Sequence, residues 1–548
     1  MGPIYRIIEL SPLSKRLRLI VFFIVILSLH GCATTKSLHE ESQPVPKAPQ
    51  PIAIHLEENI ERNVFSVAKG DDVIGRLAFI SLEKGDTLPD IARHFSLGIN
   101  GVSAANPGVD IWAPQAGERV MLPLSFILPD APRKGIVINL AAMRLFQFRG
   151  DSESLEVLTY PVGVGTDERP SPTGQMNVWR KVTRPTWHVP ASIAEDHRKK
   201  GDPLPAKVLP GPQNPLGEYA LYLSEPSYLI HGTNKPASIG LRATNGCIRL
   251  YPEDVKKLYE NTPAKTPVYI VDQPYLIGQR NGVVYLEVHA PLEDQDVVEF
   301  DKMYAKLKNI EKESGRALDW NNVKKVLAEA RGITVPIFEI VQGSGKGFAV
   351  PIELRHPGEL YGRPEIPELK PDAWSVLAAD VSDEIDAVRL AAIINHQGPQ
   401  IPARVLSKNN GYCVVAGPFN EIRQADDAIK RLKIDLEIDG TLIERAAAIS
   451  PDIEAVKERP NVAEIAQTVA PGNLMGYALQ IGAFAEEENA LSLIEKLKQK
   501  GYEASIRKEG KRPLHLVLIG RFDTSKEASE GSRLLLQKDG IKSVVYRY

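Results

Sequence analysis

The chain has few cysteines and almost no net charge. Only Cys32, Cys247 and Cys413 occur in 548 residues, and 66 basic side chains are balanced by 69 acidic ones. This balance gives no reason to expect a nucleic-acid partner, and the sequence contains no P-loop or zinc motif. No two histidines stand at metal-ligand spacing, which argues against a zinc peptidase. We therefore expect no metal and no cofactor.

Long apolar runs are also scarce, and the N-terminal one is short for a membrane span. Leu19–Leu29 follows a basic stretch and ends in the tetrapeptide LHGC at 29–32. This arrangement resembles a bacterial lipoprotein signal, with an uncleaved anchor helix as the alternative. The resemblance implies a signal peptide over 1–31 and lipidation of Cys32. Because Ala33 rather than aspartate follows, it also implies a periplasmic protein anchored at the outer membrane.

The other two cysteines have different expected roles. Residues 32–60 are rich in Glu, Gln, Pro, Ser and Lys, which predicts a flexible tether. Cys413 lies in an apolar, strand-like stretch and is expected to be a small core residue. If Cys32 carries lipid, Cys247 is then a free thiol outside the cytoplasm, where structural cysteines tend to pair. That thiol calls for a functional explanation.

Cys247 lies in the stretch TNGCIRL at 244–250, sixteen residues after His231. A thiol becomes a nucleophile when a neighbouring group takes its proton, and imidazole titrates in a suitable range. Strand alternation places Arg249 on the same side as Cys247 and the two flanking apolar residues on the other. The surrounding residues, 133–272, read as a mostly β unit that begins with a hairpin over 135–148 and contains one short helix.

The HG pair at 231–232, the turn PTG at 172–174 and the GCxR pattern at 246–249 resemble the catalytic motif of L,D-transpeptidases of the YkuD type. The resemblance covers about 133–272. It implies that Cys247 attacks the L-centre carbonyl of a peptidoglycan stem peptide, while His231 handles the thiol proton and the Gly232 carbonyl orients its ring.

The same resemblance assigns the residues around the nucleophile. Backbone N–H groups near Asn245, Gly246 and Cys247 would stabilise the oxyanion, and Gly246 would let the substrate approach. Arg249 would bind a substrate carboxylate or brace the loop. Two positions depart from the family pattern: Thr244 replaces serine, and Asn245 replaces histidine. Asparagine does not titrate, so a proton shuttle at that position is excluded.

Residues 79–124 form a separate module. A turn at Lys84–Leu88, capped by Asp86 or Thr87, opens a helix; a second helix is broken by Asn106-Pro107, and a closing strand ends at Pro123. This order resembles a LysM module, which implies a strand–helix–helix–strand fold and binding of N-acetylglucosamine-containing glycans. A packing domain of the same fold without a ligand is the alternative.

The C-terminal third contains an internal repeat with a constant offset of 103, in which Trp374 corresponds to Tyr477 and Gly417 to Gly520. Each copy predicts strand, helix, strand, strand, helix, strand. The copy at 474–548 resembles a SPOR domain, which implies binding to peptidoglycan glycan, and the copy at 371–447 resembles a degenerate one. Residues 273–370, with a helix over 319–331, are expected to be a structural extension.

Together these features predict a multidomain α+β protein that remodels peptidoglycan. Its predicted partners are stem peptides, glycan strands and, through lipid, a membrane. The acyl acceptor would be a diaminopimelate amine, giving a 3–3 crosslink, or a lysine of an acceptor lipoprotein. Two alternatives stay open: water as acceptor, giving an L,D-carboxypeptidase or crosslink hydrolase, and a non-catalytic glycan-binding scaffold.

Overall fold

A computed structural model describes most of the chain from residue 56 onward. The described residues are 56–150, 154–290, 296–339, 350–370, 372–409, 411–443, 454–455, 477–484, 487–499, 502, 504–509, 514–522, 528, 531–532, 535 and 543–547. The expected signal peptide, Cys32 and most of the expected tether lie outside them. No helix in these segments combines the length and apolar character that a membrane span requires. The chain divides into two compact units, 1–456 and 457–548.

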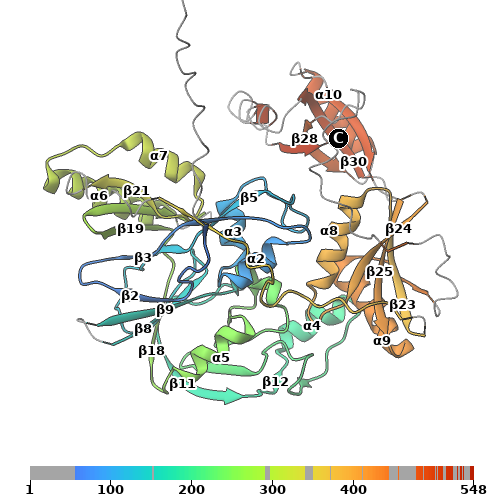
Figure 1. Ribbon diagram of the computed structural model, residues 1–548, viewed down its shortest axis with the longest axis horizontal. Coiled ribbons are helices and arrows are strands. Elements are labelled where there is room, and N and C mark those ends of the chain that lie inside the picture. The colour runs from blue at the N-terminus through green and yellow to red at the C-terminus, as the bar shows by residue number, and fades with distance from the viewer. Residues whose placement is uncertain are drawn as a thin grey trace, which may run out of the picture. The chain divides into compact units, whose positions relative to one another are not determined.

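A nine-stranded mixed sheet organises the middle of the first unit (Figure 1). Its order is β17-β15-β14-β11-β18-β7-β8-β9-β2. The strands are β2 (Val64–Val67), β7 (Gly135–Asn139), β8 (Arg144–Arg149), β9 (Leu155–Pro161), β11 (Gly174–Thr183), β14 (Tyr219–Leu223), β15 (Leu229–His231), β17 (Ile248–Arg249) and β18 (Pro267–Val271). The predicted hairpin is confirmed, because β7 and β8 pair antiparallel from Gly135–Phe148 to Asn139–Arg144.

Apolar residues on alternating positions of these strands form one core. Ile136, Ile138 and Leu145 are completely buried in it, and α5 (Pro252–Glu260) adds Val255 and Leu258. Short elements complete this part of the fold. They are β10 (Val164–Gly165), β12 (Trp187–His188), α4 (Ala191–Lys199), β13 (Lys207–Val208), η1 (Pro236–Ser238) and β16 (Arg242–Thr244). Unlike α5, α4 has no buried residue.

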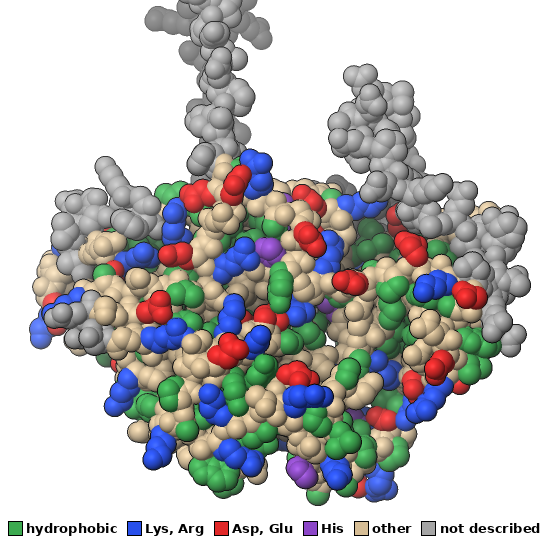
Figure 2. Space-filling model, turned by 60° about the horizontal axis from the view of Figure 1, so that its bottom comes forward, with side chains coloured by type: hydrophobic (Ala, Val, Ile, Leu, Met, Phe, Trp, Pro, Cys, Tyr) green, Lys and Arg blue, Asp and Glu red, His purple; other side chains and the backbone are tan. Residues whose placement is uncertain are grey.

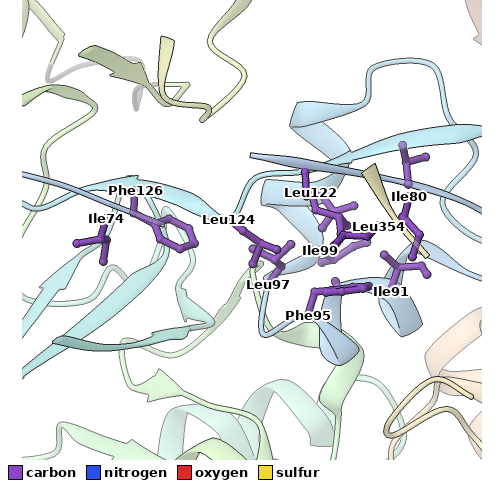
Figure 3. Close-up of a cluster of buried hydrophobic side chains, with 14 of the residues drawn as sticks. Ile74, Ile80, Ile91, Phe95, Leu97, Ile99, Leu122, Leu124, Phe126 and Leu354 are labelled. Carbon is purple, nitrogen blue, oxygen red and sulfur yellow. The ribbon is translucent and has the colours of Figure 1, made fainter. Parts of the chain in front are cut away.

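The module at 78–124 has the predicted strand–helix–helix–strand order. It consists of β4 (Ala78–Ser81), α2 (Leu88–His94), α3 (Ile99–Ala105) and β5 (Arg119–Leu122), and the Thr87 hydroxyl caps α2 by accepting from the N–H of Asp90. Figure 3 shows its buried side chains, including Ile80, Ile91 and Leu122, in one continuous apolar cluster.

Two strands from distant parts of the chain extend this small sheet to the order β1-β22-β4-β5. They are β1 (Leu56–Glu57) and β22 (Ile352–Leu354), and β22 lies between β1 and β4, parallel to both. Leu354 adds its side chain to the cluster in Figure 3. The module is therefore completed by one strand that precedes it and by one from the end of the 273–370 extension.

The extension has its own core. The strands β19 (Tyr275–Arg280), β20 (Val283–Val288) and β21 (Val335–Glu339) form an antiparallel sheet, and α6 (Asp296–Ser314) and α7 (Trp320–Glu329) pack on it. The predicted helix over 319–331 is confirmed as α7, with Asp319 as its cap and Val323 and Val326 buried. A small ribbon of β3 (Val73–Gly75) and β6 (Ser125–Ile127) joins the extension to the module, since Val73 and Ile127 share a core with Leu276.

The repeat has the predicted βαββαβ order in its first copy: β23 (Trp374–Val381), α8 (Glu384–Asn395), β24 (Ala403–Lys408), β25 (Gly411–Phe419), α9 (Ile422–Leu436) and β26 (Thr441–Ile443), with β27 (Glu454–Ala455) added at the edge. Cys413 is buried there, as predicted. The described part of the second copy contains β28 (Tyr477–Phe484), α10 (Glu487–Gln499), β29 (Ala504–Glu509), β30 (Leu514–Phe522) and β31 (Val544–Arg547).

Acidic residues of two loops and of α2 in the 78–124 module contact later parts of the same unit. Asp86 bonds His356 at 3.0 Å, Asp90 bonds His396 at 3.1 Å, and Asp110 pairs with Arg389 of α8 at 2.8 Å. The module therefore packs between the extension and the first repeat copy.

On the face drawn in Figure 2, basic and acidic side chains are interspersed rather than gathered by sign.

Candidate active site

The turn that carries Cys247 connects β16 to β17 and is closed by its own residues. The Thr244 hydroxyl donates to the Cys247 carbonyl at 2.7 Å. Gly246 has a φ of +96°, a backbone conformation that side chains rarely adopt, and a Cβ there would lie 2.8 Å from the Tyr228 ring. Glycine is therefore required by the turn itself, independently of any approaching substrate.

The loop at 166–171 packs against this turn. The Thr166 N–H donates to the Thr244 carbonyl at 3.0 Å, and the Gly165 N–H donates to the Ser171 hydroxyl at 2.9 Å. The carbonyl of Pro170 would lie 3.1 Å from a Cβ on Gly246. Two loops that are far apart in sequence thus hold the nucleophile turn in place.

His231 ends β15 and is 4% exposed. Its Nδ1 lies 2.6 Å from the Gly232 carbonyl, and a carbonyl only accepts, so Nδ1 carries the proton. Burial lowers the pKa of His231 to about 3, and the nearby positive charge of Arg249 acts in the same direction. The carbonyls of Gly232 and Leu216 raise this pKa and partly oppose the shift. The ring is therefore neutral at ordinary pH, with the lone pair on Nε2.

The Cys247 thiol is half-buried and donates to the Ser227 carbonyl at 3.6 Å. Burial raises the pKa of this thiol, although the Leu229 backbone and Arg249 act in the opposite direction. In the parallel pair β15–β17, His231 lies opposite Arg249. Cys247 precedes Arg249 by two residues and is therefore a diagonal neighbour of His231. Both pKa shifts favour a neutral thiol and a neutral imidazole over an ion pair in the resting site.

Arg249 projects on the same side of β17 as Cys247, whereas Ile248 and Leu250 are buried in the core on the other side. Its guanidinium donates to the Ser238 hydroxyl at 2.9 Å. Its Nε is buried without a hydrogen-bond partner among the described residues, and burial lowers the pKa of the group. Arg249 thus braces the segment around Ser238 and keeps an unused donor.

Asn245 is exposed, and its side-chain oxygen accepts a hydrogen bond from Arg169. Arg169 also pairs with Asp196 of α4 at 2.6 Å. Sequence patterns do not identify Arg169 or Asp196, because both lie in polar, charged segments with no periodic pattern. The residue that departs from the family pattern is therefore linked through an arginine to the helix α4.

Within the described segments, no group of three or more His, Cys, Asp or Glu side chains is arranged to hold a metal ion. Neither described cysteine is in a disulfide. The chemistry that this site offers is therefore that of a thiol, an imidazole of fixed tautomer, an arginine and the backbone donors of a tight turn.

Comparisons with known proteins agree on two domain types. Residues 133–270 match the model of the L,D-transpeptidase catalytic domain of the YkuD family, and residues 370–444 and 475–547 each match the SPOR domain. The probable L,D-transpeptidase ErfK/SrfK of Escherichia coli is 40% identical over 228 residues, which cover 41% of this chain and 73% of that protein. The probable L,D-transpeptidase YbiS of Escherichia coli is 40% identical over 227 residues, with the same coverage.

Among solved structures, the catalytic domain of the Enterococcus faecium L,D-transpeptidase, determined by NMR, is similar to part of the chain. The match has 20% identity and a TM-score of 0.20, and it covers 26% of this chain and 99% of that one.

Proposed function

Because this chain belongs to the L,D-transpeptidase family and is a cysteine-dependent enzyme acting on peptidoglycan, we propose that Cys247 forms an acyl-enzyme with a tetrapeptide stem and transfers it to an amine. The chain also contains two SPOR domains, so it is a peptidoglycan-associated enzyme of the cell envelope. The observation that carries the proposal is the fixed tautomer of His231, whose Nδ1 contacts the Gly232 carbonyl.

In the first half-reaction, the Cys247 thiol transfers its proton to Nε2 of His231 as sulfur attacks the L-centre carbonyl of the third stem residue. Backbone N–H groups of the turn 245–247 stabilise the oxyanion. The intermediate collapses by expelling D-alanine, whose amine takes the proton from His231. This cycle leaves a thioester on Cys247.

In the second half-reaction, an acceptor amine attacks the thioester and gives its proton to His231, which restores the thiol. A diaminopimelate amine would produce a 3–3 crosslink, and a protein lysine would produce a covalent anchor. The unused donor of Arg249 supports a role in holding a substrate carboxylate, in addition to its bond to Ser238.

The experiment is intact-mass analysis of the full chain after incubation with a disaccharide-tetrapeptide. Cys247→Ala removes the nucleophile, and Cys413→Ala is the matched control because that thiol is buried in a separate core. An adduct that appears in the wild type and in Cys413→Ala, but not in Cys247→Ala, supports the enzyme. Absence of both adduct and product in the wild type contradicts it and favours the scaffold.

Product analysis of the same reactions distinguishes the acceptors. A crosslinked dimer, or conjugation to a lysine peptide, supports transfer. A free tripeptide stem as the sole product indicates that water is the acceptor, so that the enzyme is a carboxypeptidase or hydrolase.

We also propose that residues 79–124 are a LysM module and that Cys32 carries a lipid that holds the protein at the outer membrane. The strand–helix–helix–strand order supports the first proposal, and the engagement of its loops by His356 and Arg389 favours packing over glycan binding. Membrane fractionation of Cys32→Ala tests the second, since loss of the lipid should release the protein.

A further inference from the structure

A cavity of about 390 Å³ lies apart from the thiol, where three parts of the first unit meet. One wall comes from α3 of the 78–124 module, a second from the hairpin at 141–144 and the segment 240–242, and a third from the end of β20 and the residues after α7. Neither Cys247 nor His231 lines it. It is therefore a site distinct from the candidate active site.

The cavity has an excess of positive charge. Arg144, Arg242 and Arg331 line it, against the single carboxylate of Glu287. That carboxylate is already engaged, because it accepts from the Ile127 N–H at 2.7 Å and contacts His289 at 2.7 Å. The charge of Glu287 also acts on Arg144, so one carboxylate faces three arginines in the cavity wall.

The described residues leave some of the hydrogen-bond donors of these arginines unused. Arg144 is 5% exposed, and its neutral partners are the Thr159 hydroxyl at 3.2 Å and the Ser96 carbonyl at 3.1 Å. Burial lowers its pKa to about 10, although the charges of Glu287 and Asp254 act in the opposite direction. Arg331 donates to the Ala105 carbonyl and lies 4.0 Å from a carboxylate oxygen of Glu329, but its Nε is buried without a hydrogen-bond partner among the described residues.

The backbone of Arg242 belongs to β16, which pairs with β10, but its side chain makes no hydrogen bond or ion pair with the residues that the structure describes. The nearby Asp272 is partly buried, which raises the pKa of its carboxyl, whereas the charge of Arg242 acts in the opposite direction. A bound anion would therefore meet one guanidinium without a hydrogen bond and two whose donors are partly used.

The remaining walls fit a short peptide. Small residues form much of the rest of the lining: Gly98, Gly101, Ala104, Ala141, Ala142 and Ala330. The C-terminal end of α7 also borders the cavity, and helix C-termini present carbonyls that accept N–H groups. A ligand with a carboxylate at one end, N–H groups and small side chains would satisfy these features together.

We propose that this cavity binds a short, alanine-rich peptide through its free carboxylate. The segment 240–242 forms one wall and leads into the nucleophile turn, and Ser238 just before it holds Arg249. An occupant therefore touches the segment that braces the active site. The proposal does not depend on the catalytic activity of Cys247.

The test is binding of alanyl-alanine to the full chain after Cys247 has been alkylated with iodoacetamide, which blocks the active site. Calorimetry is repeated with alanyl-alanine amide, which lacks the carboxylate. We expect the amide to bind at least tenfold more weakly. Equal binding of acid and amide, or no binding of the acid, would overturn the proposal.

Two variants locate the site. Gly101→Leu fills the cavity, since a Cβ there meets nothing within 4 Å and the residue lies in a helix, and it should abolish binding. Arg242→Gln removes the guanidinium that has no hydrogen bond and should weaken binding at least tenfold. Arg76→Gln, an exposed arginine outside the cavity, is the control. Unchanged binding by Gly101→Leu contradicts the proposal.

Melting temperatures establish that the variants are folded, and Ala104→Leu on the same helix replaces Gly101→Leu if that variant unfolds. Inorganic phosphate is titrated in parallel. If phosphate binds as tightly as the dipeptide and displaces it, the cavity takes small anions and the peptide proposal is wrong. If phosphate binds more weakly by tenfold or more, the peptide assignment is supported.

Discussion

Arg169 donates a hydrogen bond to the side-chain oxygen of Asn245, two residues before the nucleophile. The same guanidinium pairs with Asp196 at 2.6 Å, so one side chain connects the nucleophile turn to α4. α4 has no buried residue of its own. Its position near the site therefore depends on polar contacts such as this one.

We expect Arg169→Gln to lower kcat/KM about tenfold, which corresponds to about 1.4 kcal/mol, because hydrogen bonds to charged groups contribute about 1.5–3 kcal/mol. Steady-state acyl transfer measures the change. Arg198→Gln is the control, since that exposed arginine pairs with Glu195 on the same helix. In a double-mutant cycle, Asn245→Ala should add little to Arg169→Gln, and fully additive losses would show that the contact is not functional.

The pH dependence follows from the neutral resting pair. Because the pKa of His231 is lowered to about 3, the imidazole stays unprotonated as the pH falls from 7 to 5. The rate of Cys247 acylation should therefore show no acid limb from this group above about pH 4. An acid limb near pH 6.5 would contradict a buried, neutral base.

Alkylation by iodoacetamide tests the raised pKa of Cys247. Because the thiolate is the reactive form, alkylation should be slow at neutral pH. Because the thiol deprotonates only above its ordinary range, the rate should continue to rise beyond about pH 8.5. Cys413→Ala protein leaves a single described thiol to follow by mass spectrometry. A rate that levels off below about pH 7 would indicate a thiolate–imidazolium pair instead.

Gly246→Ala should reduce activity by at least about tenfold. The φ of +96° and the 2.8 Å approach to the Tyr228 ring make a Cβ costly, and strained positions of this kind cost about 1–3 kcal/mol. Gly101→Ala is the matched glycine control, because its Cβ has open space within a helix and alanine favours helices. Kinetics and melting temperature of both variants test this, and equal activity would be evidence against strain at the turn.

Asp254 offers a stability test away from the thiol. It is 2% exposed in α5, and burial raises the pKa of its carboxyl to about 7. Since the folded pKa lies above the ordinary value of about 3.9, this group favours the folded state at low pH, and that contribution is lost as the pH rises through about 7.

Asp254→Asn has no such titration. Its melting temperature relative to the wild type should therefore increase between about pH 4 and pH 8, as followed by circular dichroism. Glu260→Gln on the same helix removes an exposed carboxyl and should leave the difference constant. A pH-independent difference for Asp254→Asn would mean that the buried carboxyl is not protonated in the folded protein.

The sequence patterns correctly predicted those helices and strands whose formation depends on neighbouring residues in the chain. Alternating apolar residues located the hairpin β7–β8, the cap at Thr87 located α2, and the offset of 103 located the first repeat copy. In each case the side-chain period or the capping chemistry is contained within a few residues.

The missed features depend on remote pairing. The strands β2 and β22 have four and three residues, too few for a readable period, and each exists because a distant strand pairs with it. Arg169 reads as a charged loop residue, and only the fold brings it to Asn245. The shifted pKa of His231 likewise depends on burial by segments that the motif does not contain.

The insertion of β22 between β1 and β4 has a consequence for biosynthesis. The hydrogen-bonding edge of β4 stays open until residues more than two hundred positions later have been made, which takes tens of seconds at about 5–20 residues per second. The unpaired N–H and C=O groups of an open strand edge can pair with strands of other chains. Expression fragments that end before residue 352 would keep that edge permanently, so truncations at the apparent module boundary should aggregate more readily than those that end after Leu354.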